Sequence, residues 1–179
     1  MLFFNRFVDP GWEVWVLDNY SIPGTNERTP DGQMMFEAKY TGNLGAARRL
    51  GERLAETSVA LTKVKSKFAH VEAVCAVPYF GVDRPISVPH LLATSVAAVL
   101  RVPDHSNLVS KTRETAPVKG APSPVVDPTQ FEAKWNAKER RVLLVDDVYR
   151  SGGTLASLAR ALQKVNVIPV AGIAAVRAM

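Results

Sequence analysis

Cysteine is almost absent from this sequence, since Cys75 is the only one among 179 residues. A single thiol excludes an internal disulfide and a zinc site built from a cysteine cluster. Histidine is also scarce, and His70, His90 and His105 show no metal-ligand spacing. We therefore expect no histidine ligand, and cytoplasm is the expected compartment.

Long apolar runs are absent as well, because no stretch approaches the ~18 residues of a membrane span. Residues 1–12 are too short and too soon interrupted for a signal peptide. The length fits one domain that buries roughly 70% of its unfolded surface. We expect a single domain over residues 1–179, no membrane partner, and residues 1–40 as an edge or cap region.

The net charge is +5 and the sequence pI is about 9.5. A high pI can mark nucleic-acid binding. The basic residues are scattered, however, and they are not interleaved with aromatic residues in a stacking pattern. A polyphosphate ligand would account for part of the excess and solvated helix faces for most of the rest, so nucleic acid gains little support as a partner.

The most informative stretch is VLLVDDVYRSGGT, residues 142–154. Its four leading apolar residues predict a buried central strand. Asp146 and Asp147 follow at once, and residues 151–154 form a turn of two hydroxyls and two glycines. Helical apolar spacing then predicts a helix over residues 155–165. The order is strand, acid pair, glycine turn and helix.

This order favours a ligand that is anionic at one end and rich in hydroxyls at the other. Ligands of open parallel sheets bind at the carboxyl ends of strands, and a glycine turn that opens a helix offers N–H groups to an anion. Ser151 and Thr154 can add hydroxyl donors. The acids repel a phosphate and suit neutral hydroxyls, a metal ion or both. A ribose 5-phosphate fits, and an ordinary strand–turn–helix with a solvated acid pair is the alternative.

Residues 142–154 resemble the signature of type I phosphoribosyltransferases, which bind phosphoribosyl pyrophosphate (PRPP) with Mg2+. The resemblance implies that Asp146 and Asp147 are the catalytic acids and hold the ribose hydroxyls, directly or through water and Mg2+. It assigns the 5-phosphate to Arg150, Ser151, Gly152, Gly153 and Thr154. The rival glycine motifs fit less well, because a P-loop needs a lysine before its Ser or Thr and the dinucleotide spacing is absent.

The pattern along the rest of the chain predicts alternating strands and helices. Together with the resemblance it implies a Rossmann-like α/β fold: a parallel sheet with helices on both faces, as in type I phosphoribosyltransferases, plus a small N-terminal cap. The expected strands are Trp12–Leu17, Phe36–Tyr40, Val71–Val77, Asn107–Ser110, Val142–Val145 and Val167–Val176, and the further helices are Asn43–Lys67, His90–Leu100 and Phe131–Lys138.

Three basic residues are candidates for binding the pyrophosphate of PRPP. Arg84 lies in the turn after the strand 71–77, where type I phosphoribosyltransferases hold this group, and an ordinary surface arginine is the alternative. Lys111 and Arg113 open a proline-rich segment that runs to residue 128. A loop of this length inside a domain is usually functional or disordered, and a basic flap would exclude water from the reaction.

Residues 71–177 resemble the ComF family of phosphoribosyltransferase-like proteins. The similarity lies in AVPYFGVDRPISVPHLLA, in Val142–Thr154, in Ala174–Arg177 and in Lys39-Tyr40 ahead of the first long helix. The chain lacks the family's zinc knuckle, and Arg84 alone is kept of its R-G-F-N element. Arg150 stands where purine-type enzymes carry an acid, which argues against purine salvage.

The sequence thus predicts a phosphoribosyltransferase that moves the phosphoribosyl group of Mg-PRPP to an unidentified nitrogen acceptor and releases pyrophosphate. Two alternatives stay open: a non-catalytic regulator that senses PRPP or a nucleotide, and a ComF-like accessory protein in DNA uptake or processing. The ligand in each nucleotide-related case is PRPP or another ribose 5-phosphate. A homodimer is also left open.

Overall fold

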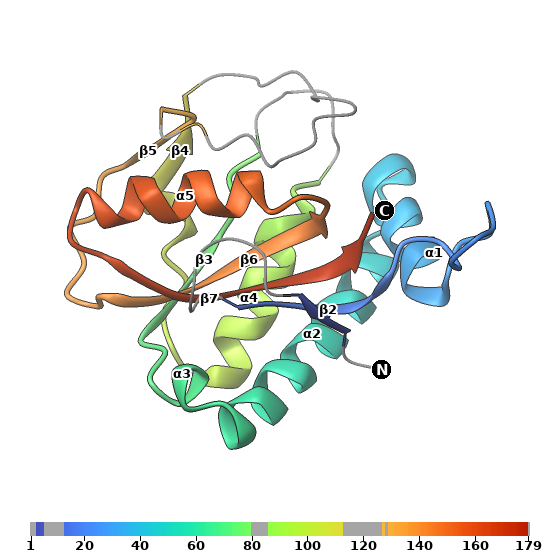
Figure 1. Ribbon diagram of the computed structural model, residues 1–179, viewed down its shortest axis with the longest axis horizontal. Coiled ribbons are helices and arrows are strands. Elements are labelled where there is room, and N and C mark those ends of the chain that lie inside the picture. Colours follow the sequence, from blue (N-terminus) through green and yellow to red (C-terminus); the bar gives the residue numbers. More distant parts are fainter. Residues whose placement is uncertain (1–2, 6–12, 80–85, 113–126, 128, 179) are drawn as a thin grey trace.

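The computed structural model describes residues 3–5, 13–79, 86–112, 127 and 129–178 (Figure 1). At its centre is a five-stranded sheet with the strand order β1-β2-β7-β6-β3. β2, β7, β6 and β3 run parallel, and β1 pairs antiparallel with β2. These strands are β1 (Phe3–Asn5), β2 (Val14–Asn19), β3 (Ala73–Ala76), β6 (Arg141–Tyr149) and β7 (Ile168–Arg177).

Both faces of this sheet are buried, which explains why its strands read as continuous apolar runs. In β6, Leu143 and Val145 pack into the core on one face, whereas Val142 and Leu144 pack into the core on the other. This alternation follows from the two-residue period of a strand. The predicted parallel α/β sheet with helices on both faces is confirmed.

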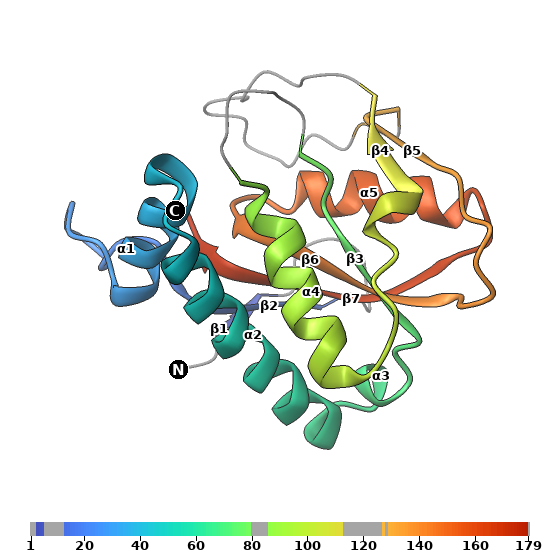
Figure 2. The ribbon, with the colours of Figure 1, turned by 180° about the vertical axis from the view of Figure 1, so that it is seen from behind.

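Two long helices cover one face and lie side by side in Figure 2, namely α2 (Leu44–Val64) and α4 (Val88–Leu100). α2 begins where the Asn43 side chain accepts a hydrogen bond from the N–H of Ala46, at 3.1 Å. The short α3 (Ser66–Ala69) follows α2. The other face carries α5 (Gly153–Gln163), with a small antiparallel sheet of β4 (Val109–Lys111) and β5 (Phe131–Ala133) beside it.

Two sequence predictions were wrong. The segment 36–40 was expected to be a strand, but it closes α1 (Pro30–Phe36) and opens a π-helix, η1 (Glu37–Thr41). Its F-E-A-K-Y alternation imitates a strand, while the Thr29-Pro30 start selects a helix. In place of the helix expected over 131–138, residues 131–133 form β5, because Phe131 pairs with Lys111 of β4, and residues 134–138 are neither helix nor strand.

Other predictions need smaller corrections. α4 begins two residues before the expected His90, and it is not buried all round, since Val99 is 44% exposed. β6 continues through the acid pair to Tyr149 instead of ending at Val145. Trp15 packs in the core, whereas Trp12 lies outside the described residues. Among the described residues, no helix is long and apolar enough to cross a membrane.

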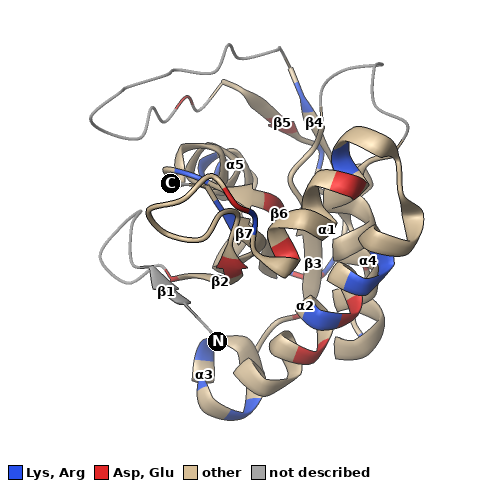
Figure 3. Cartoon of the chain, turned by 90° about the vertical axis from the view of Figure 1, so that its right-hand side faces the viewer, with Lys and Arg blue, Asp and Glu red and all other residues tan. Residues whose placement is uncertain are grey.

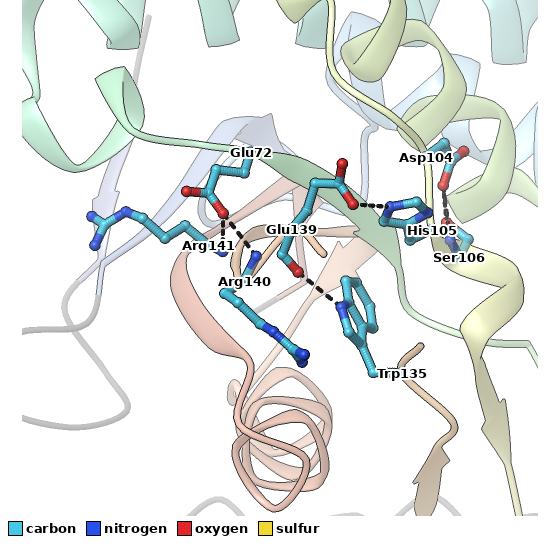
Figure 4. Close-up of polar contacts among 8 residues, drawn as sticks. All are labelled: Glu72, Asp104, His105, Ser106, Trp135, Glu139, Arg140 and Arg141. Atoms are coloured by element: carbon cyan, nitrogen blue, oxygen red, sulfur yellow. Dashed lines mark hydrogen bonds and ion pairs between the residues drawn. The ribbon is translucent and has the colours of Figure 1, made fainter. Parts of the chain in front are cut away.

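A polar network joins the elements at the amino ends of β3 and β6 (Figure 4). The Glu72 carboxylate accepts hydrogen bonds from the N–H groups of Arg140, at 2.7 Å, and Arg141, at 3.1 Å. His105 Nε2 lies 3.1 Å from the Glu139 carboxylate. This network fixes how the two strands begin, and it lies at the opposite end of the sheet from the acid pair.

Candidate functional site

The acid pair lies in the part of β6 that extends beyond the end of its neighbour β3. Ala76, the last residue of β3, pairs with Val145, and β6 then continues beside β7, with Asp146 opposite Ala174. Asp146 and Asp147 therefore stand at the carboxyl edge of the sheet, where ligands of parallel α/β proteins bind. Figure 3 looks onto this edge and shows α1 beside the ends of β6 and β7.

Both carboxyl groups are largely removed from water, since each residue is 7% exposed. The Asp146 carboxylate accepts the N–H of Asp147 at 2.8 Å. Burial, followed by the neighbouring charge of Asp147, raises the pKa of Asp146 to about 7, while the ammonium of Lys39 opposes this rise. The pair therefore carries less than two full negative charges near neutral pH.

Lys39 is a site residue that the sequence analysis did not assign. Its Nζ lies 2.6 Å from Oδ2 of Asp147, and the two side chains are 14% and 11% exposed. Lys39 belongs to η1, and π-helical turns occur often at functional sites. The only signal for it in the sequence was Lys39-Tyr40 as part of a family resemblance, which says nothing about Asp147.

The position of Lys39 depends on how α1 docks on the end of β2. Thr29 caps α1, because its hydroxyl accepts the N–H of Gly32 at 3.0 Å and donates to the carbonyl of Asn19 at 2.5 Å. At the other end, the Glu37 carboxylate accepts a hydrogen bond from the Asn43 amide at 3.1 Å. These contacts anchor the combined α1–η1 segment at both ends and place Lys39 beside Asp147 of the acid pair.

The predicted phosphate turn follows β6 directly. Arg150 and Ser151 are exposed, and Gly152 adopts φ +80°, a left-handed conformation that favours glycine. α5 then begins at Gly153 without a side-chain cap, and its first intrahelical bond runs from Ala156 N–H to Gly152 at 2.9 Å. The N–H groups of residues 153–155 thus precede the helical ladder and can bind an anion.

The structure brings the predicted acids and the predicted phosphate turn together on one strand–turn–helix unit. Of the predicted pyrophosphate residues, Lys111 ends β4, at the point where the chain leaves for residues 113–126. Arg84 and Arg113 lie outside the described residues. The pyrophosphate role of these three residues stays a prediction.

The donor set at the acid pair bears on the predicted Mg2+. Among the described residues, no group of three or more His, Cys, Asp or Glu side chains could hold a metal ion. Mg2+ is often bound by one or two carboxylates, with substrate phosphate and water completing its shell. Asp146 and Asp147 fit a cation that arrives with its phosphate ligand, and they do not amount to a closed metal cage.

Comparisons with known proteins give similarity at the level of structure alone. No family model and no curated protein matches the sequence. Adenine phosphoribosyltransferase from Leishmania donovani aligns over 96% of this chain and 73% of its own, with a TM-score of 0.47 and 13% identity. Adenine phosphoribosyltransferase from Leishmania tarentolae aligns over 97% and 94%, with a TM-score of 0.42 and 11% identity.

Proposed function

We propose that this chain is a phosphoribosyltransferase that binds the ribose 5-phosphate end of PRPP at the carboxyl edge of β6. One observation carries the proposal: the buried acids Asp146 and Asp147 and the uncapped start of α5 lie on consecutive segments of one strand–turn–helix unit. This unit has carboxylates that can accept hydrogen bonds from ribose hydroxyls and, in the segment that follows, N–H groups that can donate to a phosphate. A phosphorylated pentose requires both.

Each part of the unit has a separate task. The N–H groups at the start of α5, with the hydroxyls of Ser151 and Thr154, bind the 5-phosphate, and the positive end of the helix dipole assists them. Asp146 and Asp147 accept hydrogen bonds from the ribose hydroxyls. Exposed Arg150 adds positive charge beside the phosphate.

In the transfer step, the bond from the anomeric carbon to pyrophosphate breaks and its electron pair leaves with pyrophosphate. A nitrogen lone pair of the acceptor forms the new bond, and the nitrogen then releases its proton to water. Positive charge develops on the sugar, and a carboxylate of the acid pair would stabilise it. Mg2+, held by Asp146 and Asp147 together with the ligand, would neutralise the pyrophosphate as it departs.

The proposed pyrophosphate residues are Arg84, Lys111 and Arg113. The finer assignment to the ComF family stays part of this proposal and relies on the sequence motifs quoted above. A cytoplasmic location is also part of the proposal, and it relies on the single cysteine and the lack of a long apolar run in the sequence. The acceptor is a nitrogen base, and the arginine at position 150 favours one outside the purines.

Ligand-dependent melting tests the proposal. Mg-PRPP should raise the melting temperature of the wild type, and the double variant Asp146→Asn, Asp147→Asn should lose this shift while keeping its fold. Glu139→Gln is the control, because Glu139 lies at the opposite end of the sheet. An absent shift in the wild type would overturn the proposal, and an equal shift in the double variant would overturn the roles of the acids.

Transfer itself needs a second measurement. Pyrophosphate release should be followed with Mg-PRPP and a panel of purine, pyrimidine and other nitrogen bases. Release with at least one base supports the transferase, whereas PRPP binding without release across the panel would favour the sensing regulator.

A further inference from the structure

The ion pair between Lys39 and Asp147 differs from the surface pairs of the chain. The Lys134–Glu132 pair, for example, has a separation of 3.7 Å with side chains 78% and 55% exposed, and such pairs contribute little. Lys39 and Asp147 are 2.6 Å apart and almost enclosed. An enclosed carboxylate that loses its partner charge is costly, so Asp147 depends on some cation being present.

The backbone around Lys39 is anchored, so the segment that carries this lysine has little freedom to move away from Asp147. Ala38, its neighbour in η1, is fully buried in the core that α2 and α4 share with the sheet. The hydroxyl of Thr41 donates to the carbonyl of Glu37 at 2.6 Å, and Gly42 closes η1 with φ +69°. The ammonium is therefore delivered to Asp147 by a segment anchored on both sides.

We propose that Lys39 is a further residue of the sugar-phosphate site and serves as the resident cation of the acid pair. Its ammonium contacts Oδ2 of Asp147, the oxygen to which a divalent ion would otherwise bind. A free divalent ion would have to displace that ammonium while being repelled by it. The first consequence is that the acid pair binds no divalent cation in the absence of a ligand. The second is that it binds one together with a phosphate ligand, and this second statement rests on the proposed function.

Mn2+ binding to the ligand-free protein tests the first statement directly. Mn2+ should be titrated into metal-free wild type and the Lys39→Met variant, with free Mn2+ followed by electron paramagnetic resonance. We expect Lys39→Met to bind one Mn2+ at least tenfold more tightly than the wild type. Adding Asp147→Asn to Lys39→Met should abolish this gain.

Two further variants serve as controls. Lys39→Arg keeps the positive charge and should behave as the wild type. Lys63→Met removes one positive charge from the exposed last turn of α2 and should leave Mn2+ binding unchanged. Lys39→Gln is the substitute if circular dichroism shows that Lys39→Met does not fold, since glutamine keeps a polar end beside Asp147.

The outcomes separate this proposal from the proposed function. Equal Mn2+ affinity of the wild type and the neutral Lys39 variants would overturn the role of Lys39, whatever the result with PRPP. Tight Mn2+ binding by the wild type that is lost in Asp147→Asn would also overturn it. A missing response to Mg-PRPP would overturn the proposed function and leave the Mn2+ comparison valid.

Discussion

Gly32 lies so close to Tyr20 that a Cβ at position 32 would overlap the carbonyl oxygen of Tyr20. This contact lets α1 dock on the end of β2 and so determines where η1 places Lys39. The lack of a side chain at Gly32 is thus linked to the ion pair between Lys39 and Asp147.

Gly32→Ala should therefore destabilise the protein by about 1–3 kcal/mol, as overpacking against rigid structure does. Chemical denaturation measures the effect. Gly45→Ala is the matched control, because its Cβ would approach no backbone atom closely and only the Oδ1 atom of Asn43, at 3.2 Å. The control should stay within about 1 kcal/mol of the wild type, and an equally mild effect at Gly32 would contradict the docking argument.

Asp146→Asn should stabilise the metal-free protein at pH 8 and stabilise it clearly less at pH 5. Burial raises the pKa of Asp146 from 3.8 to about 7. Between these two pH values, Asp146 keeps its proton in the folded state and loses it in the unfolded state. Wild-type stability attributable to Asp146 is full below pH 3.8 and is lost as the pH rises to about 7. Denaturation in EDTA at both pH values checks this, and a destabilised variant at pH 8 would refute it.

Gly152→Ala should lower stability by roughly 1–2 kcal/mol, because an L side chain is strained in the left-handed region. It should also weaken binding of ribose 5-phosphate, since Gly152 shapes the turn before α5. Gly24→Ala is a close control, with the same φ of +80° and open space around its Cβ. Calorimetry should show weaker binding for Gly152→Ala alone, and an equal loss in Gly24→Ala would argue against a specific role of the turn.

Glu72→Gln should lower stability at pH 7 and lose this effect in acid. The N–H groups of Arg140 and Arg141 lower the pKa of Glu72 below 4.5, because they favour its charged form. The stability from this carboxylate is present above pH 4.5 and is lost as the pH falls through the lowered pKa. Melting curves from pH 7 to pH 3 test this, and an effect independent of pH would indicate a contribution from shape alone.

The strand, the acid pair and the glycine turn could be predicted because their signals are local. Four apolar residues, two acids and a turn follow one another without interruption in residues 142–154. The sheet architecture followed from the same alternation of strands and helices. A strand buried on both faces and a helix that begins at a glycine turn need no knowledge of distant partners.

The strand expected over 36–40 missed a local helix start at Thr29-Pro30, whereas the other errors arose where a distant partner decides the structure. Residues 131–138 have apolar spacing that suits a short helix, and pairing with β4 makes residues 131–133 a strand instead. Lys39 was missed as a site residue for the same reason, since its partner Asp147 lies far along the sequence. No local pattern relates a π-helical lysine to a carboxylate at the end of another element.

The pairing of β2 with β7 joins two strands that lie far apart in the sequence, with Trp15 opposite Ile173. A ribosome releases the amino end first, so a nascent chain exposes β2 and the segment bearing Lys39 before β7, the parallel partner of β2, exists. Contacts of such long range slow folding. The acid pair would consequently receive its lysine only after β7 has been made, and a chain cut short before β7 would contain the whole signature yet no assembled site.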